Sequence, residues 1–294
     1  MLWAVFTLIA AAAQTARNAM QRELTASLGT VGATHVRFLF GFPFALLILA
    51  GVMAVTGAGL PATPLGFWPW TIGGALAQIA ATALMLSAMG ERSFVVAYAY
   101  IKTEPVSVAL FGLIFLGDNI TPLSATAILI ATAGVIVISL EPGAGGVGTT
   151  RSTLIGLGAG SMFAVSAISY RGGILALGIP DFVVAATFTV TVGLVIQAAL
   201  LSLYLALREP AVLRAIARAW KPSLFAGFMG AFASEFWFLA FAITTAANVR
   251  TLALVEVLFA QGVTRFVFKQ PTTPREGLGI VLVVIGVALL VWAY

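Results

Sequence analysis

Long, uninterrupted apolar runs are the feature that most constrains how this chain can fold. Ten of them can be counted along the sequence, each close to the roughly 20 residues that a helix needs to cross a bilayer. The runs are continuously apolar and lack the alternation of a membrane β-barrel. The sequence therefore predicts an all-α polytopic membrane protein with ten transmembrane helices. The runs cover residues 2–20, 33–56, 67–89, 93–116, 121–140, 152–170, 181–207, 222–243, 246–268 and 274–293.

Composition supports this class and argues against several others. The chain is 61% hydrophobic and 9% charged, which is far more apolar than a soluble domain of this size requires. It has no cysteine and one histidine, His35, so a disulfide framework and a thiolate or multi-histidine metal site are excluded. The basic residues are scattered at run ends rather than gathered in a patch. We therefore expect no cofactor, no metal and no nucleic-acid partner.

The chain also carries an internal repeat. A Gly-rich linker over 142–151 separates a first five-helix repeat, 1–141, from a second, 152–294. Five spans are an odd number, so the second repeat must enter the membrane inverted. Inverted repeats are typical of transporters, whose substrate site lies near the midplane between the repeats. At an offset of 152 residues, Glu104 coincides with Glu256, Thr121-Pro122 with Thr273-Pro274, and Gly134 with Gly286.

Basic residues predict the orientation of the spans. Most Lys and Arg residues fall in the loops after odd-numbered runs, and the positive-inside rule places such loops in the cytoplasm and both termini outside. Within the basic stretch 208–221, Arg214, Arg218 and Lys221 share one helical face. Val212, Leu213, Ile216 and Trp220 can then lie toward lipid. This pattern is typical of an interfacial helix, and a solvated charged loop is the alternative.

The fourth run contains two charges beside a helix breaker, Lys102, Glu104 and Pro105. Proline lacks an N–H and crowds the carbonyl of Ile101, so the helix is expected to kink or open there. The freed carbonyl must find a partner or line a wet cavity. A charge at the bilayer centre costs at least about 2.5–3.5 kcal/mol, so such residues are first considered functional. Pro105 is the predicted hinge.

Two interpretations of these charges are open. Lys102 and Glu104 contact the substrate's charged ends or a coupled proton. Alternatively, Glu104 and its repeat mate Glu256 are buried partners that hold the two repeats together, for example through Lys102 and Arg250. Both roles can hold at once, because a transporter's site often lies at its repeat interface.

Further polar and aromatic side chains fall on repeat-related spans and suit an amphipathic zwitterion, with charged groups for its ends and aromatics for its side chain. Gln78 and Thr82 share one helical face, whereas Glu235 and Phe238 share another from which Trp237 points away. For any single Gln, Ser or Thr the alternative is an interhelical hydrogen bond, and for an aromatic it is packing. The candidate substrate-binding residues are Gln14, Gln78, Thr82, Tyr98, Lys102, Glu104, Ser166, Tyr170, Glu235, Trp237, Asn248, Arg250 and Glu256.

Three stretches carry a resemblance to a known family. They are THVRFLFGFPFALLIL (34–49), IKTEPVSVALFGLIFLGDNITP (101–122) and the degenerate second copy VEVLFAQGVTRFVFKQPTTPREGLG (255–279), which lacks the proline. With the ten inverted spans, they resemble the drug/metabolite transporter superfamily, in particular EamA-type transporters and their aromatic amino-acid exporter branch. The resemblance implies export of small metabolites by alternating access through a central cavity, in a bacterial inner membrane. It also implies cytoplasmic termini, whereas the charge bias favours termini outside.

The expected function is therefore a secondary transporter, not an enzyme, that exports small amphipathic metabolites, amino acids with aromatic or neutral side chains first among them. Its partners would be the substrate and membrane lipid, and it would be a monomer or weak homodimer. The alternatives are a proton-coupled multidrug or cation antiporter that uses Glu104 and Glu256, and an exchanger of the sugar-phosphate or nucleotide-sugar type. A membrane enzyme would need a clustered acid/base or metal-binding constellation, which the sequence does not show.

Overall fold

The computed structural model describes residues 1–89, 100–139, 150–259, 261 and 273–294. Within these ranges the regular elements are helices, and none is a strand. The elements are α1 (Leu2–Leu39), α2 (Phe42–Thr56), α3 (Phe67–Met89), α5 (Glu104–Phe111), the π-helical turn η1 (Gly112–Leu116), α6 (Pro122–Ser139), α7 (Thr150–Ala176), α8 (Phe182–Arg208), α9 (Pro210–Arg218), α10 (Trp220–Ile243), α11 (Ala246–Leu252), the 3₁₀ turn η2 (Ala253–Val255) and α13 (Pro274–Trp292).

The bundle is apolar outside and polar inside. Leu47 and Val55 on α2 are 69% and 88% exposed, while Arg17 and Arg37 on α1 are 1% and 5% exposed. A soluble protein shows the opposite distribution. Because lipid replaces water around such a surface, this pattern places the chain among multi-pass membrane proteins.

Seven helices among the described residues are long and apolar enough to cross a membrane. The first, fourth and ninth runs of the sequence are not among them, so the ten-span count stays a prediction. Thr150 and Arg151, which were assigned to the linker, begin α7 instead; residues 142–149 lie outside the described ranges. The seven segments are Glu23–Thr56, Phe67–Ala88, Pro122–Ser139, Thr153–Ala176, Phe182–Arg208, Trp220–Ile243 and Pro274–Trp292.

The connection between the first two runs is helical rather than a loop. α1 continues past residue 20 and reverses at Gly29, whose φ of 70° lies in the left-handed region that favours glycine. The side chain of Gln21 ties the turn by donating from Nε2 to the carbonyl of Ala33 at 3.0 Å. The returning segment breaks again before α2, which begins with Pro43 in its first turn.

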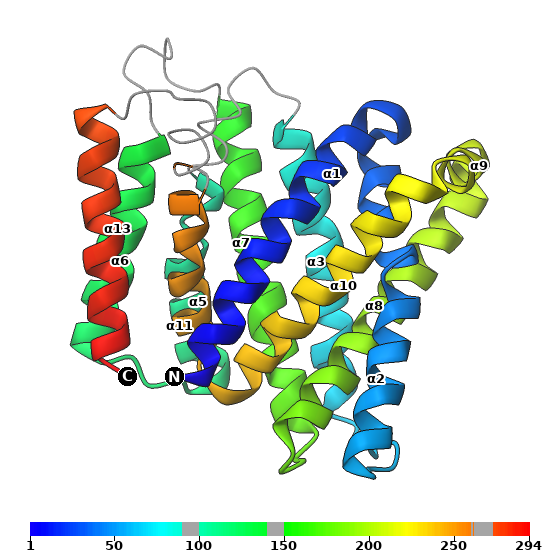
Figure 1. The fold of residues 1–294 in the computed structure, drawn as a ribbon, viewed down its shortest axis with the longest axis horizontal. Coiled ribbons are helices and arrows are strands. Elements are labelled where there is room, and N and C mark those ends of the chain that lie inside the picture. The colour runs from blue at the N-terminus through cyan, green and yellow to red at the C-terminus, as the bar shows by residue number, and fades with distance from the viewer. Residues whose placement is uncertain (90–99, 140–149, 260, 262–272) are drawn as a thin grey trace.

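The main packing pairs follow the order that an inverted repeat predicts. α1 packs on α10, and α3 packs on α7. In the order of the predicted spans, the first pair joins the first span to the eighth, and the second pair joins the third span to the sixth. Exchange of the two halves converts one pair into the other. α2 with α8, α5 with α11, and α6 with α13 also pack, and each of these pairs maps onto itself. This order of pairs is the one expected for two repeats related by exchange, and the inverted repeat itself stays a prediction. Both termini lie at the same end of the bundle (Figure 1).

The α6–α13 contact repeats the same symmetry at the level of residues. A Cβ on Gly134 would lie 2.8 Å from the carbonyl oxygen of Gly279, and a Cβ on Gly286 would lie 2.8 Å from that of Ala127. The repeat offset of 152 residues relates the two contacts, because Gly134 corresponds to Gly286 and Gly279 corresponds to Ala127. The two helices run antiparallel in close contact (Figure 1), which only small residues permit.

The fourth run is interrupted where Pro105 predicted it. The helix stops at Ile101, residues 102–103 form a turn, and α5 restarts with Pro105 in its first turn. The carbonyl of Tyr100 accepts from Thr103 Oγ1 at 2.7 Å and from its backbone N at 3.1 Å. The equivalent point of the ninth run is the 3₁₀ turn η2, which forms without a proline. Both breaks adjoin the charged residues of the site.

The central part of the basic stretch 208–221 forms the amphipathic helix α9, which ends at Arg218; Trp220 and Lys221, expected on the same helix, begin α10 instead. Arg214 and Arg218 are exposed. Ile216, which was expected to face lipid, is 1% exposed and packs in the same apolar cluster as Leu205 and Leu24. The apolar face of α9 therefore binds the bundle itself, because α1 and α8 offer it an apolar surface.

Candidate substrate-binding cavity

A polar cavity lies inside the bundle, between the predicted halves. Its free volume is only about 50 Å³, while a water molecule occupies about 30 Å³ of liquid and ligand pockets commonly measure about 300–1,000 Å³. The side chains of the wall therefore fill most of the cavity in this conformation. Its lining consists of Gln14, Arg17, Asn18, Arg37, Gln78, Met85, Ile101, Lys102, Glu104, Phe163, Ser166, Ala167, Tyr170, Ser234, Trp237, Phe238, Phe241, Arg250 and Glu256.

Helical stripes aim these side chains inward. On α10 the lining residues are Ser234, Trp237, Phe238 and Phe241, spaced i, i+3, i+4 and i+7 along one face. On α7 the stripe of Phe163, Ser166, Ala167 and Tyr170 has the same spacing, and on α1 Gln14, Arg17 and Asn18 follow it. Three long helices therefore supply most of the wall, and the interrupted fourth and ninth runs supply the charges.

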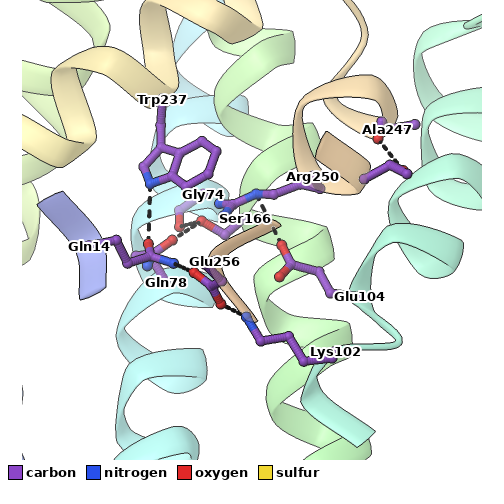
Figure 2. Close-up of polar contacts among 11 residues, drawn as sticks. Gln14, Gly74, Gln78, Lys102, Glu104, Ser166, Trp237, Ala247, Arg250 and Glu256 are labelled. Atoms are coloured by element: carbon purple, nitrogen blue, oxygen red, sulfur yellow. Dashed lines mark hydrogen bonds and ion pairs between the residues drawn. The ribbon is translucent and has the colours of Figure 1, made fainter. Parts of the chain in front are cut away.

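The charged residues of the two interrupted runs pair across the cavity. Lys102 forms an ion pair with Glu256, and Arg250 Nε lies 3.1 Å from Glu104 Oε1. The four side chains are between 6% and 14% exposed. Figure 2 shows the two pairs side by side, each joining a residue of the first half to one of the second. The structural interpretation of the charges named these four residues without assigning the pairs, which the structure supplies.

A chain of hydrogen bonds extends one of these pairs to α10. Gln14 Nε2 donates to Glu256 Oε2 at 3.4 Å, and Trp237 Nε1 donates to Gln14 Oε1 at 3.1 Å (Figure 2). The guanidinium carbon of Arg250 lies 4.5 Å from the Trp237 ring centroid and 5.4 Å from that of Phe241. Cation–π attraction thus holds Arg250 against the aromatic wall while it faces Glu104.

Hydrogen bonds and two glycines position the opposite wall of the cavity. Ser166 Oγ lies 2.8 Å from Gln78 Oε1 and 3.1 Å from the carbonyl of Gly74, both on α3 (Figure 2). The Tyr170 ring lies between two glycines, since a Cβ on Gly74 or Gly193 would approach it to 3.0 or 2.8 Å. The ring also stands 4.6 Å from that of Phe238, centroid to centroid. Because Gly74 on α3 and Gly193 on α8 have no side chain, the Tyr170 ring fits between the two helices and lines the cavity.

Four predicted site residues are not among the lining residues. Thr82 is buried and accepts from Arg37 Nη1 at 3.3 Å. Glu235 faces α8, where Thr187 Oγ1 donates to it at 2.5 Å; Trp237, expected to point partly elsewhere than Phe238, lines the cavity together with it. Asn248 donates to Thr244 Oγ1 at 3.1 Å near the start of α11. Tyr98 lies outside the described residues.

Two arginines were missed as site residues. Arg17 and Arg37 line the cavity and are buried. The signal was present, since both are charges inside apolar runs and Arg17 lies three residues after Gln14 on the same face.

One end of the bundle is tied by a third ion pair. Arg171 Nη2 lies 3.2 Å from Asp118 Oδ1, and Arg171 Nη1 donates to the carbonyls of Phe241 and Thr244 at 2.7 and 2.6 Å. Arg171 thereby satisfies the last carbonyls of α10, which have no partner within the helix. It also joins α7, α10 and the segment after η1 next to Tyr170 and Phe241 of the cavity wall.

A charged cavity enclosed by lipid-facing helices is the arrangement expected of a membrane transporter. Residues 1–140 match the model of the EamA-like transporter family. The first 140 residues of the chain are thus similar to EamA-like transporters, as the sequence resemblance implied.

Comparison with solved structures supports the fold. One of them, described only as "Crystal structure of protein", is 16% identical with a TM-score of 0.73, and the match covers 99% of this chain and 95% of that one. Twenty-eight chains of solved structures match. A search of curated proteins found no match.

Proposed function

We propose that this transporter exports small amphipathic metabolites, amino acids with aromatic or neutral side chains first among them, by alternating access. The observation that carries the proposal is the meeting of both halves' charged groups in one aromatic-lined cavity. A zwitterion can replace these internal pairs, its carboxylate binding Lys102 or Arg250 and its ammonium binding a glutamate. Trp237, Tyr170 and Phe238 provide the surface for an apolar side chain.

Exchange of internal pairs for substrate pairs couples binding to opening. In this conformation the ion pairs connect the two halves, and the side chains of the wall leave little free volume between them. A substrate that satisfies both charges separates the pairs without leaving either charge unpaired in a membrane. The halves can then rock, with the break at Pro105 as the hinge of the fourth run. This cycle needs no cofactor.

The test is uptake of radiolabelled amino acids into proteoliposomes of the purified protein. Saturable flux, with competition among aromatic and neutral amino acids, is expected. Glu104→Gln is expected to remain folded and to lose at least tenfold in flux, or to lose its pH dependence, because the amide cannot carry the charge. Glu209→Gln makes the same change at an exposed position and is expected to transport normally.

Two results would count against this proposal. Wild-type flux through Glu104→Gln would remove the site from the mechanism. Flux of cations, drugs or sugar phosphates, with none of amino acids, would establish the antiporter or the sugar-phosphate type of exchanger instead.

A further inference from the structure

Arg17 and Arg37 are buried in the cavity wall without a carboxylate partner among the described residues. Arg17 Nη2 donates to Asn18 Oδ1 at 2.7 Å, and Arg37 donates to Thr82 Oγ1 at 3.3 Å and Ser234 Oγ at 3.4 Å. Arg17 Nε and Nη1 and Arg37 Nε have no hydrogen-bond partner in the part of the chain described. Neutral oxygens therefore contact both guanidinium groups, and three of their nitrogen atoms donate to no group in the described residues.

The two arginines occupy the same region of the wall although they come from opposite sides of the Gly29 turn. Both side chains pass over Gly230 of α10, where a Cβ would lie 3.1 Å from Arg37 Cγ and 3.5 Å from Arg17 Cδ. The glycine leaves room for two stems side by side. Neighbouring guanidinium groups with unused donors form a site for the oxygens of an anion.

The charges around the cavity do not balance. Its lining contains four cations, Arg17, Arg37, Lys102 and Arg250, and two carboxylates, Glu104 and Glu256. The carboxylates already form ion pairs with Lys102 and Arg250, so two positive charges are left over. Two like charges inside a membrane are costly unless an opposite charge joins them.

Other carboxylates in the described part of the chain do not fill this gap. Glu235 is buried but contacts Thr187 and does not line the cavity, and Asp118 pairs with Arg171. Glu91 and Glu141 lie outside the described residues. None of the carboxylates in the described residues therefore compensates Arg17 and Arg37, and the anionic group of a ligand can do so.

We propose that the cargo is a net anion, an amphipathic organic acid whose carboxylate or phosphate binds between Arg17 and Arg37. This inference rests on the proposed transport function and, within the small amphipathic metabolites, favours organic acids over amino acids. Because both glutamates are already paired, an acid without an ammonium group binds more tightly than the zwitterion with the same apolar body. Tyr170 and Phe238, which line the same cavity, hold that body.

The test compares ligands with one body and different charges. Phenylpyruvate, phenyl phosphate, phenylalanine and 2-phenylethylamine are titrated by calorimetry into the full-length protein in detergent, first without and then with excess chloride. Phenylpyruvate or phenyl phosphate is expected to bind at least tenfold more tightly than phenylalanine, and the amine not at all. Which of the two anions binds better distinguishes a carboxylate cargo from a phosphate cargo.

Variants then locate the binding site. Arg17→Gln and Arg37→Gln are each expected to weaken anion binding at least tenfold, and Arg37→Lys to weaken it less, since it retains the charge without the planar fork. Arg218→Gln removes an exposed arginine of α9 and is expected to change nothing. Melting curves report folding. If a glutamine variant fails to fold, the ligand series on the wild-type protein still decides.

The outcomes separate this inference from the proposed function. Phenylalanine binding as tightly as phenylpyruvate, binding of chloride alone, or anion binding unaffected in folded Arg17→Gln and Arg37→Gln proteins would overturn the inference. Saturable amino-acid flux without anion binding would overturn it and leave the proposed function intact. Anion binding at the two arginines without flux of any ligand would support the site and refute transport.

Discussion

At the scale of single residues, the molecule depends on charges that the membrane makes costly. Lys102, Glu104, Arg250 and Glu256 are tolerated because each has an opposite charge across the cavity. Removal of one member of a buried pair costs about 3–5 kcal/mol, whereas its replacement by two apolar groups is often neutral. Stability and transport therefore impose different demands on the same four residues.

A double-mutant cycle on Arg250 and Glu104 separates these demands. Arg250→Leu alone is expected to lower the free energy of unfolding by about 3–5 kcal/mol, because Glu104 is left charged without its guanidinium. Adding Glu104→Leu is expected to restore most of that loss while flux stays abolished. Denaturant unfolding in detergent and proteoliposome flux are the measurements. A double variant no more stable than the single one would contradict the ion-pair account.

Two adjacent glycines on α3 provide a matched test of the aromatic wall. A Cβ on Gly74 would stand 3.0 Å from the Tyr170 ring, whereas a Cβ on Gly73 meets only Ser169 Oγ at 3.8 Å. Gly74→Ala is expected to displace Tyr170 and raise the substrate Kd at least fivefold. Gly73→Ala is expected to leave Kd unchanged and to stabilise the helix by roughly 0.5–1 kcal/mol. Equal effects of both variants on Kd would exclude the proposed role of the ring.

At the scale of elements, helix contacts are set by small residues and by breaks. Between α6 and α13 the backbones approach through Gly134, Gly279 and Gly286. Around the cavity, the regular helix is broken beside the charges, at the turn before α5 and at the 3₁₀ turn η2. The close contact provides a fixed base, and the breaks let backbone groups lie beside a wet cavity.

The α6–α13 contact can be tested with two glycines of one helix. A Cβ on Gly279 would meet Ile138 Cγ1 at 2.5 Å and the Gly134 carbonyl oxygen at 2.7 Å, but a Cβ on Gly277 meets nothing within 4 Å. Gly279→Ala is expected to cost about 1–3 kcal/mol by overpacking, measured by thermal or denaturant unfolding. Gly277→Ala is the control and is expected to cost nothing. A neutral Gly279→Ala would show that the helices separate freely.

At the scale of the whole molecule, the orientation of the bundle in the membrane stays a prediction that the structure makes testable. The segment after α2 and helix α9 lie at opposite ends of the bundle, and both termini lie at the end opposite α9 (Figure 1). The basic residues of α9 predict that its end faces the cytoplasm. The natural absence of cysteine makes the orientation directly measurable.

Single cysteines at Ala62 and Ala217, both exposed, test this orientation. A membrane-impermeant thiol reagent is expected to label Ala62→Cys in intact cells and Ala217→Cys only after the membrane is disrupted. The unsubstituted protein is the control for background labelling. The reverse pattern would place the termini in the cytoplasm, as the family resemblance implies, and labelling of both positions from one side would contradict the fold.

The sequence by itself determined the membrane class, the break at Pro105 and the residues able to form charged pairs. Apolar run length, proline geometry and the cost of buried charge are local properties, and each can be recognised without a partner. Polar and charged residues inside apolar runs can be recognised in this way, and nine of the predicted site residues line the cavity.

Only the tertiary structure decided which face of each helix is the inner one. Lipid and the protein interior are both apolar, so hydropathy does not fix the rotation of a helix about its axis; packing against its neighbours does. For this reason Glu235 was assigned to the cavity although it faces α8, and Arg17 and Arg37 were missed although they are part of the cavity wall. The partner of each charge depends on that rotation, and so does the charge that the cavity presents to a substrate.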